Sequence, residues 1–286
     1  MQLRPAIQAA ISQLEAAGID QPRISAEVLA FHLLGIDRAY LFARPERELT
    51  VTEQSDYENF IARRASGEPL QYIIGHQEFW KRDFLVSPAV LIPRPETEHL
   101  IEAVLELVQH YTLGGARLKL IDVGTGSGAI AITLARELPQ SELHAVDLSP
   151  AALDVARTNA ARLGAHVRFA QSDVLADVAR DGSFDFVVSN PPYVGLNEAD
   201  KVQDVVKHYE PHMAVFAGDG GLDVIRRLIP QAGEALRPGG WLLMEIGYTQ
   251  ADAVMSLLGS WNNVHSVPDL AGIPRVIVAQ KTVTNR

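Results

Sequence analysis

The chain has 286 residues, of which 47% are hydrophobic, so it is long enough for an ordinary domain together with a smaller one. Its 25 Lys and Arg residues against 35 Asp and Glu residues give a formal net charge of −10, which argues against a broad cationic surface for long DNA or RNA. The chain contains no Cys, which excludes disulfides, Cys-ligated zinc and a thiol nucleophile.

The N-terminal part, residues 4–67, is predicted to form a small helical unit. Apolar residues recur at helical spacing after Pro5, a second helix is expected at residues 26–34, and Thr50-Val-Thr-Glu53 matches a capping box at the start of a third. The unit has no catalytic motif, so it is either a structural cap or a module that recognises a partner. Charged residues interrupt the apolar positions of residues 1–25, which fits neither a signal peptide nor a membrane span, and we expect a cytoplasmic protein without a membrane partner.

Residues 69–98 are interpreted as a connector between two domains. Short apolar runs on either side of Lys81-Arg82 predict a β-hairpin. Residues 91–98, Leu-Ile-Pro-Arg-Pro-Glu-Thr-Glu, follow the hairpin. Pro95 suits the first position of a helix, and Glu96 lies favourably near the positive end of that helix. A rigid linker is the alternative interpretation of this segment.

From residue 118 the pattern changes to alternating strands and helices, which indicates a mostly parallel sheet with helices on both faces. The expected fold class is therefore α/β, with a doubly wound Rossmann-like sheet and a small N-terminal helical domain joined through a β-hairpin linker. We expect a helical domain at residues 1–68, the hairpin and linker at 69–98, and the sheet domain at 99–286. Strands are predicted at residues 118–123, 143–146, 167–170, 184–189, 241–246 and 275–279, and helices at 129–138, 150–163, 221–236 and 249–258.

A glycine-rich loop, Gly124-Thr125-Gly126-Ser127-Gly128, joins the first of these strands to its helix. Glycines let the backbone approach a ligand closely, and the start of the helix offers free N–H groups. Because Gly124, Gly126 and Ala129 also satisfy the looser dinucleotide pattern, the loop predicts an adenosine-containing cofactor without distinguishing NAD from another one.

Two acidic residues follow the next two strands. Asp147 ends the second strand, nineteen residues after Gly128, where its carboxylate can accept hydrogen bonds from both hydroxyls of a ribose. Asp173 follows the third strand and is placed to meet an adenine amino group, although a helix N-cap explains the same residue equally well.

The stretch Asn190-Pro191-Pro192-Tyr193 follows the predicted strand 184–189 and therefore lies at the rim where open α/β sheets bind ligands. The two prolines stiffen the turn and lack N–H groups, so the carbonyls there have no competing local donors. An amide, bare carbonyls and an aromatic ring suit a planar NH2 group. An ordinary loop is the alternative interpretation, since Asn and Pro commonly follow a strand.

Together, the glycine loop, Asp147 and residues 190–193 resemble the class I S-adenosylmethionine-dependent methyltransferases that methylate a nitrogen on a planar group. From about Ala65 to the C-terminus, and more loosely through the N-terminal helices, the chain is similar to one bacterial family, the release-factor glutamine methyltransferases. The most specific part of this resemblance is the segment 91–98. The other segments that carry it are Tyr72-Ile-Ile-Gly75, Phe79, Glu210-Pro211, Gly218, Gly221-Leu222 and Asp269-Leu-Ala-Gly-Ile-Pro-Arg275.

The resemblance implies methyl transfer from S-adenosylmethionine, which leaves as S-adenosylhomocysteine, with no metal. The implied acceptor and partner is a class 1 peptide chain release factor, methylated on the side-chain nitrogen of the glutamine in its Gly-Gly-Gln tip, which modulates translation termination. The implied cofactor residues are Gly124, Thr125, Gly126, Ser127, Gly128, Asp147, Asp173, Val174 and Asn190. The implied substrate residues are Asn190, Pro191, Pro192, Tyr193, Arg94 and Glu96. Some relatives carry an aromatic residue at the position of Val174, so adenine would pack on an aliphatic side chain here.

An amide nitrogen is a poor nucleophile because its lone pair is delocalised into the carbonyl, and the expected catalytic residues Asn190, Pro191 and Tyr193 must compensate for this. The Asn190 side-chain oxygen and the Pro191 carbonyl would accept the two N–H bonds, which orients the nitrogen and stabilises the positive charge that develops on it. Tyr193 would pack against the amide plane. No strong general base is needed before attack, since the N–H becomes acidic only as the methyl arrives.

Other functions fit parts of the sequence. An adenine-N6 DNA methyltransferase would use a related [Asn/Asp]-Pro-Pro-[Tyr/Phe] motif, but the chain is acidic and has no evident basic recognition region. An NAD-dependent oxidoreductase explains only the glycine loop, and a non-enzymatic binding protein leaves the intact motifs unexplained. Zinc and hydrolase chemistry fit less well, because the chain has no Cys ligand and no G-x-S-x-G nucleophile elbow.

Overall fold

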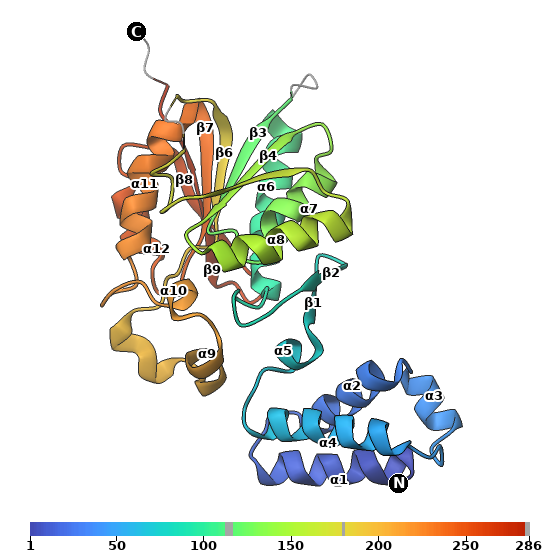
Figure 1. Ribbon diagram of the computed structural model, residues 1–286. Coiled ribbons are helices and arrows are strands. Elements are labelled where there is room, and N and C mark those ends of the chain that lie inside the picture. Colours follow the sequence, from blue (N-terminus) through green and yellow to red (C-terminus); the bar gives the residue numbers. More distant parts are fainter. Residues whose placement is uncertain (112–116, 179–180, 284–286) are drawn as a thin grey trace. The chain divides into compact units, whose positions relative to one another are not determined.

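The computed structural model describes residues 1–111, 117–178 and 181–283 (Figure 1). The chain divides into two compact units. The first consists of residues 1–76 with 204–209, and the second of residues 77–203 with 210–286.

The first unit is helical, as the sequence predicts, and its fourth helix starts at the predicted capping box. Thr50 Oγ1 accepts from the Glu53 N–H at 3.2 Å, and the Glu53 carboxylate accepts from the Thr50 N–H at 2.9 Å. Three helices of this unit, α3, α5 and α9, were not predicted, because five or six residues are too few to show helical periodicity. The helices are α1 (Leu3–Ala16), α2 (Pro22–Leu34), α3 (Arg38–Ala43), α4 (Val51–Ala65), α5 (Leu70–Ile74) and α9 (Asp204–Tyr209).

The core of the first unit forms where the apolar faces of α1, α2 and α4 meet. Tyr57 of α4 is buried in this core, and its hydroxyl donates to the carbonyl of Ala26 in α2 at 2.9 Å. A buried tyrosine needs such a partner for its hydroxyl, so this bond fixes how the two helices pack. The cluster around it includes Leu3, Ile7, Leu14, Leu29 and Ile61.

The predicted hairpin is confirmed: β1 (His76–Phe79) and β2 (Arg82–Leu85) form a two-stranded sheet. Its turn residues Trp80 and Lys81 have φ angles of 49° and 57°, the positive values that a two-residue hairpin turn requires. Beyond the hairpin, Pro95 begins the 3-10 turn η1 (Pro95–Thr97), which leads directly into α6 (Glu98–Tyr111). The interpretation of Pro95 as a helix start is therefore correct to within this one turn.

The second unit is built on a seven-stranded sheet with the order β5-β4-β3-β6-β7-β9-β8. Neighbouring strands from β5 to β7 run parallel, whereas β9 is antiparallel to both β7 and β8. This confirms the predicted doubly wound, mostly parallel sheet. The strands are β3 (Lys119–Val123), β4 (Glu142–Asp147), β5 (Val167–Gln171), β6 (Phe184–Ser189), β7 (Leu236–Glu245), β8 (Asn262–Pro268) and β9 (Pro274–Gln280).

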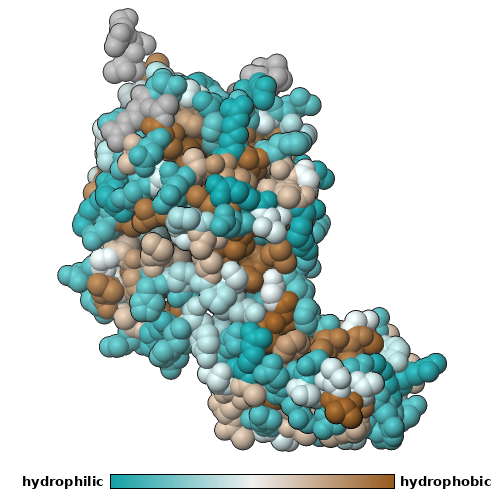
Figure 2. All heavy atoms as spheres, in the orientation of Figure 1, coloured by the Kyte–Doolittle hydropathy of each residue, from teal (hydrophilic) through white to brown (hydrophobic). Residues whose placement is uncertain are grey.

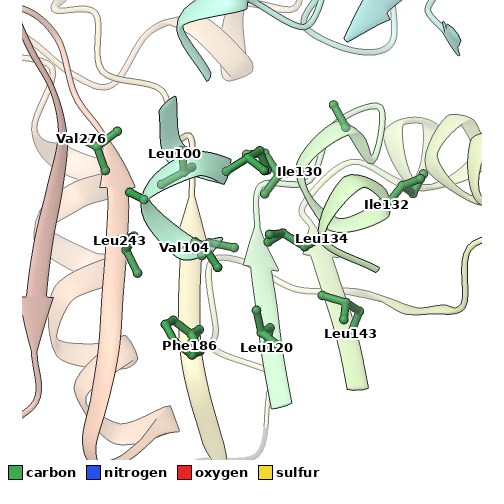
Figure 3. Packing of buried hydrophobic residues seen from close by; sticks show 14 of the residues in the cluster. Leu100, Val104, Leu120, Ile130, Ile132, Leu134, Leu143, Phe186, Leu243 and Val276 are labelled. Carbon is green, nitrogen blue, oxygen red and sulfur yellow. The ribbon is translucent and has the colours of Figure 1, made fainter. Parts of the chain in front are cut away.

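Buried side chains alternate between the two faces of the sheet, so each face carries its own core. On one face, Leu120 and Phe186 pack with Leu100 of α6 and Leu134 of α7. Figure 3 shows these side chains together over the central strands. On the other face, Ile121 and its neighbours pack against α11 and α12. The remaining elements of this unit are α7 (Ala129–Glu137), α8 (Pro150–Leu163), η2 (Leu196–Lys201), α10 (His212–Val215), α11 (Asp223–Ala235) and α12 (Ala251–Leu257).

Polar residues occupy much of the face that Figure 2 shows, with apolar residues scattered among them. Some large apolar side chains are nevertheless exposed, among them Phe42 in the first unit and Leu270 in the loop between β8 and β9. Among the residues that the structure describes, no helix has both the length and the apolar character needed to cross a membrane.

Candidate active site

A cavity of about 330 Å³ lies in the second unit beside the carboxyl ends of β3, β4 and β6. This volume is in the range of small-molecule sites. It brings together most of the residues predicted for the site, although they come from separate parts of the chain. Those that line it are Arg94, Gly124, Thr125, Gly126, Ser127, Asp147, Asp173, Val174, Asn190, Pro191 and Pro192. Of the predicted and described residues, Glu96, Gly128 and Tyr193 do not line it.

The glycine loop forms the wall of the cavity at the end of β3. Gly124 and Gly126 have φ angles of 73° and 55°, which side-chain-bearing residues rarely adopt, and a Cβ at either position would point into open space. The N–H groups of Gly124 and Thr125 both donate to the carbonyl of Val146 in β4, at 2.9 and 3.0 Å. The loop is therefore held to the neighbouring strand by its backbone while its open side faces the cavity.

Asp122 supports this loop from inside and was not predicted as a site residue. Its Oδ2 accepts from the Thr125 hydroxyl at 2.6 Å and from the Ala131 N–H at 3.2 Å. The pKa of Asp122 is raised to about 7, chiefly by its complete burial and to a smaller extent by the nearby negative charge of Asp147. The side chain makes no contact with solvent, so its part in the site is to shape the loop.

Asp147 lies at the end of β4, where the sequence predicts a ribose-binding carboxylate. One of its oxygens accepts from the Gly126 N–H at 2.8 Å, and the other accepts from the Ser149 N–H at 2.9 Å. Each carboxylate oxygen can accept a second hydrogen bond. The carboxylate is thus rigidly held and still able to receive hydroxyl donors from the cavity, which fits a ribose.

Asp173 and Val174 follow β5 and line the cavity together. Asp173 accepts two hydrogen bonds from Arg227 of α11, at 2.7 and 2.9 Å, and turns follow it, so the alternative of a helix N-cap is wrong. Val174 is buried and has a φ angle of 56°, an uncommon conformation for a β-branched residue. The Leu175 N–H donates to Gln231 Oε1 at 2.8 Å, which helps to hold this backbone in place.

Gly128 stands apart from the rest of its loop because it packs against a helix and does not face the cavity. A Cβ at this position would lie 2.7 Å from Ile132 Cδ1 and 3.2 Å from Ala156 Cβ. The residue therefore allows α7 and α8 to approach closely. In the structure its role is helix packing beneath the loop.

The stretch 190–193 is anchored by a network that the sequence did not reveal. Asn190 Nδ2 donates to Thr97 Oγ1 at 3.0 Å, and Thr97 Oγ1 donates to Glu245 Oε2 at 2.7 Å. The Tyr193 hydroxyl donates to the other oxygen of Glu245 at 3.2 Å. Three segments, the turn after β6, η1 and the end of β7, are joined through one carboxylate.

Glu245 is almost fully buried at the end of β7. The pKa of Glu245 is raised above its ordinary value, and burial is the largest cause. The hydrogen bonds from Thr97 and Tyr193 oppose this rise, and the negative charge of Glu96 adds to it. Burial, followed by the charge of Glu245, likewise raises the pKa of Tyr193. A glutamate at the end of the apolar run Trp-Leu-Leu-Met was the available signal in the sequence, because an unpaired buried carboxylate is costly.

A second clamp holds the far end of the same turn. Gln250 Nε2 donates to the Tyr193 carbonyl at 2.8 Å and to the Gly221 carbonyl at 3.3 Å, while Gln250 Oε1 accepts from the Gly247 N–H at 2.9 Å. A Cβ on Gly221 would lie 2.2 Å from the Tyr193 carbonyl oxygen, so only glycine fits there. The turn is therefore fixed at both ends, through Asn190 and through Tyr193.

Arg94 and Glu96 differ in their surroundings. Arg94 lines the cavity and forms an ion pair with the buried carboxylate of Glu210, which also accepts from the Ile92 N–H at 3.3 Å. This pair fastens the segment 91–98 to the start of α10. Glu96 is exposed and contributes its charge near Glu245.

Two family descriptions match the chain. The PrmC N-terminal domain matches residues 5–75, and the methyltransferase small domain matches residues 102–213. The first match covers nearly all of the N-terminal helices, and the second includes the glycine loop and the turn 190–193.

Similar curated proteins extend over almost the whole chain. A release factor glutamine methyltransferase from Koribacter versatilis is 59% identical over 281 residues, which is 98% of this chain and 99% of that protein. Proteins of the same name from Moorella thermoacetica and Vibrio cholerae are 44% and 40% identical and cover 98% and 97% of this chain, and 99% and 96% of their own lengths.

Solved structures share the fold at lower sequence identity. The catalytic domain of hMettl16, in complex with a 3′UTR hairpin, is 17% identical with a TM-score of 0.55 and covers 87% of this chain and 94% of its own. A 16S rRNA methyltransferase from T. thermophilus, in complex with AdoMet and guanosine, is 19% identical with a TM-score of 0.50 over 72% of this chain and 49% of its own.

Proposed function

The chain belongs to the release factor glutamine methyltransferase family, and we infer that it transfers a methyl group from S-adenosylmethionine to a glutamine side-chain nitrogen of a peptide chain release factor. We propose further that the acceptor is the glutamine of the Gly-Gly-Gln tip of class 1 release factors. The observation that carries the release-factor substrate is the similarity over almost the whole chain to release factor glutamine methyltransferases. The orientation of Asn190, whose NH2 group is committed to Thr97, fits an acceptor that carries N–H groups.

The cavity residues suit the proposed cofactor. Asp147 can accept ribose hydroxyls, the open backbone of Gly124 and Gly126 leaves room for the chain that bears the sulfonium, and Asp173 with Val174 would hold the adenine. When bound, S-adenosylmethionine supplies a methyl group that is already activated by the positive charge on sulfur. A metal is not needed for that activation, and we propose that none takes part.

The substrate amide would lie against the turn 190–193. Within the described residues, neither Asn190 Oδ1 nor the Pro191 carbonyl accepts a hydrogen bond from the chain. Both oxygens can therefore accept the two N–H groups of a primary amide, and positive charge that develops on its nitrogen would be stabilised by them. Tyr193 packs beside the core and its hydroxyl donates to Glu245, so we propose that it acts on the substrate by holding the turn in place.

The N-terminal helices are proposed to recognise the protein substrate, since they form a unit of their own without a catalytic constellation. Release factors act on ribosomes in the cytoplasm, so we propose that compartment for the enzyme. The net charge of −10 supports a protein partner over a long nucleic acid.

The proposal is tested by incubating the enzyme with labelled S-adenosylmethionine and a purified class 1 release factor. A matched release factor whose Gly-Gly-Gln glutamine is replaced by alanine and a double-stranded DNA serve as controls. We expect label only in the unaltered release factor, and mass spectrometry of its peptides should locate one methyl group on that glutamine. Label in the DNA, or equal label in the two release factors, would contradict the proposal.

A further inference from the structure

Asn190, Thr97 and Glu245 form a hydrogen-bonded series that leads from the cavity into the interior of the second unit. The bonds measure 3.0 Å from Asn190 Nδ2 to Thr97 Oγ1 and 2.7 Å from Thr97 Oγ1 to Glu245 Oε2. Asn190 and Thr97 line the cavity, whereas Glu245 is only 2% exposed and does not. Glu245 can therefore act on a bound substrate only through its partners Thr97 and Tyr193, and of these two Thr97 is the one that bonds Asn190.

The direction of these bonds follows from the chemistry of the three groups. A threonine hydroxyl has one hydrogen, and an ionised carboxylate can only accept. Glu245 receives the Tyr193 hydroxyl on Oε1 and requires the Thr97 hydrogen on Oε2. What remains toward Asn190 is a lone pair of the Thr97 oxygen, which can be satisfied only by the NH2 side of the amide.

A flipped Asn190 amide would bring its oxygen against a Thr97 oxygen that has no hydrogen to offer. Two acceptors would then face each other in a buried place, at a cost similar to leaving a buried polar group unsatisfied. Because the two ends of the amide point in different directions, holding Nδ2 on Thr97 also fixes where Oδ1 points. It leaves Oδ1 as an acceptor that no described residue occupies.

We propose that Glu245 and Thr97 are positioning residues that orient the Asn190 amide so that Oδ1 accepts from the nitrogen to be methylated. The inference rests on the proposed function and deepens it, because it explains why the site takes a nucleophile that carries N–H groups. An acceptor fixed in this way discriminates against a substrate group without a hydrogen to donate.

The competing explanation is that Thr97 and Glu245 merely fasten η1 to β7. A fastening role would lower stability and activity whatever residue stands at position 190. An orienting role acts through Asn190 alone, so it disappears when the Asn190 amide is absent. A double-mutant cycle between Thr97 and Asn190 separates the two explanations.

The experiment compares Thr97→Val, which keeps the shape and removes the hydroxyl, with Thr97→Ser, which keeps the hydroxyl. Single-turnover methylation of a class 1 release factor is measured with saturating cofactor, and cofactor affinity is measured by calorimetry. We expect methylation by Thr97→Val to be slower by about tenfold to a hundredfold, because the variant loses the hydrogen bonds that join Asn190 to Glu245. Its cofactor affinity should be unchanged. Thr97→Ser should lie closer to wild type than to Thr97→Val.

The matched control is Thr158→Val, the same change at an exposed residue of α8 whose hydroxyl bonds only to its own helix at the carbonyl of Asp154. It should react at the wild-type rate. In the Asn190→Ala background, adding Thr97→Val should change the rate by less than about twofold. If Thr97→Val does not fold, Glu245→Gln carries the same cycle.

Two results would overturn the inference: a Thr97→Val enzyme as fast as wild type, or an equal loss of rate with and without the Asn190 amide. A wild-type enzyme that methylates no release factor glutamine gives a different result, since it removes the proposed function and this inference with it. Methylation of the release factor by the wild-type enzyme shows which case applies, and saturating cofactor keeps differences in cofactor affinity among the variants out of the measured rates.

Discussion

The side-chain amide of Gln250 donates a 2.8 Å hydrogen bond to the carbonyl oxygen of Tyr193. Gln250 is buried, and the same NH2 group also reaches the carbonyl of Gly221 at 3.3 Å. One side chain thus holds the end of the turn 190–193 next to the loop that precedes α11. The turn is stiff because of its prolines, and the hydrogen bond from Gln250 also holds it in place.

We predict that Gln250→Ala slows methyl transfer by about tenfold and lowers the free energy of unfolding by about 1–3 kcal/mol, since it leaves two buried carbonyls without their donor. Gln280→Ala is the matched control, because Gln280 Nε2 makes a similar 2.9 Å bond to the carbonyl of Gly239 at the other end of β7. Single-turnover rates and urea denaturation provide both measurements. Equal rates for the two variants would show that the clamp does not matter for the reaction.

Asp147→Ala should weaken S-adenosylmethionine binding by about tenfold to a hundredfold, the loss of charge-assisted hydrogen bonds to the ribose. The carboxylate is already oriented by the N–H groups of Gly126 and Ser149, so little entropy is lost when it accepts a ligand. Calorimetry measures the affinity, with Asp154→Ala as a control that removes an exposed carboxylate from α8. Unchanged affinity in a folded Asp147→Ala protein would contradict the assignment.

The strand ends and the helices beside them could be predicted because their signals are local. The strand 184–189 and the helix 150–163 have the predicted bounds, since one is a short β-branched and aromatic run and the other lies between the Ser149 cap and Gly164. Parallel strands end at one edge of a sheet, so the glycine loop, Asp147 and Asn190 could be expected to meet there. They do line one cavity.

The parts that could not be predicted depend on contacts between distant segments. Thr97 and Glu245 are separated by 148 residues, and neither has a sequence neighbour that reveals the other. The strand β8 was missed because Asn262–Pro268 is rich in polar residues and becomes a strand by pairing with β9. The start of β7 was missed for a similar reason, since Arg237-Pro-Gly-Gly240 looks like a turn but lies inside the strand.

The rate of methyl transfer should fall at acidic pH through Glu245. Burial raises the pKa of this carboxyl above its ordinary value of 4.5, with Glu96 adding to the shift and Arg275 opposing it. Once protonated, Glu245 can donate to Thr97, Thr97 can donate to Asn190 Oδ1, and the amide is no longer held in one orientation. The acid limb of the pH–rate profile should therefore lie above pH 4.5.

Stability depends on the same group with the opposite sign. Folded Glu245 holds its proton more tightly than the unfolded chain does, so its contribution to the free energy of unfolding falls as the pH rises from the ordinary to the raised pKa.

The variant Glu245→Gln cannot titrate at position 245, so the part of the acid limb of the pH–rate profile that Glu245 causes should be absent from it. The rates are measured with saturating cofactor. Saturation keeps the titration of Asp122 near pH 7 from entering through cofactor affinity. Identical acid limbs in the variant and the wild type would contradict this assignment.

Asn190→Ala removes the acceptor itself and should slow methyl transfer by about a hundredfold to a thousandfold, as the loss of one preorganised hydrogen-bonding group does elsewhere. Asn190→Asp keeps an acceptor and the size of the side chain, so it should retain more activity than Asn190→Ala while binding the cofactor within about tenfold of wild type. Single-turnover methylation of a release factor with saturating cofactor measures both variants. An Asn190→Asp enzyme no faster than Asn190→Ala would show that acceptance is not the role of Asn190.

The hydrogen-bonded series also predicts a compensating change. In Asn190→Asp, the new carboxylate and Glu245 compete for the single hydrogen of Thr97, because both can only accept. Adding Glu245→Gln supplies an NH2 group that can donate to the Thr97 oxygen. The Thr97 hydrogen is then free to be donated toward position 190, and all the hydrogen bonds of the series run in the reverse direction with every group satisfied.

We therefore expect the double variant Asn190→Asp with Glu245→Gln to react faster than Asn190→Asp alone, although Glu245→Gln slows the enzyme when Asn190 is intact. Thr97→Val should abolish this rescue, since the hydroxyl relays it. If Glu245→Gln slows both backgrounds by the same factor, the three side chains do not act as one oriented series.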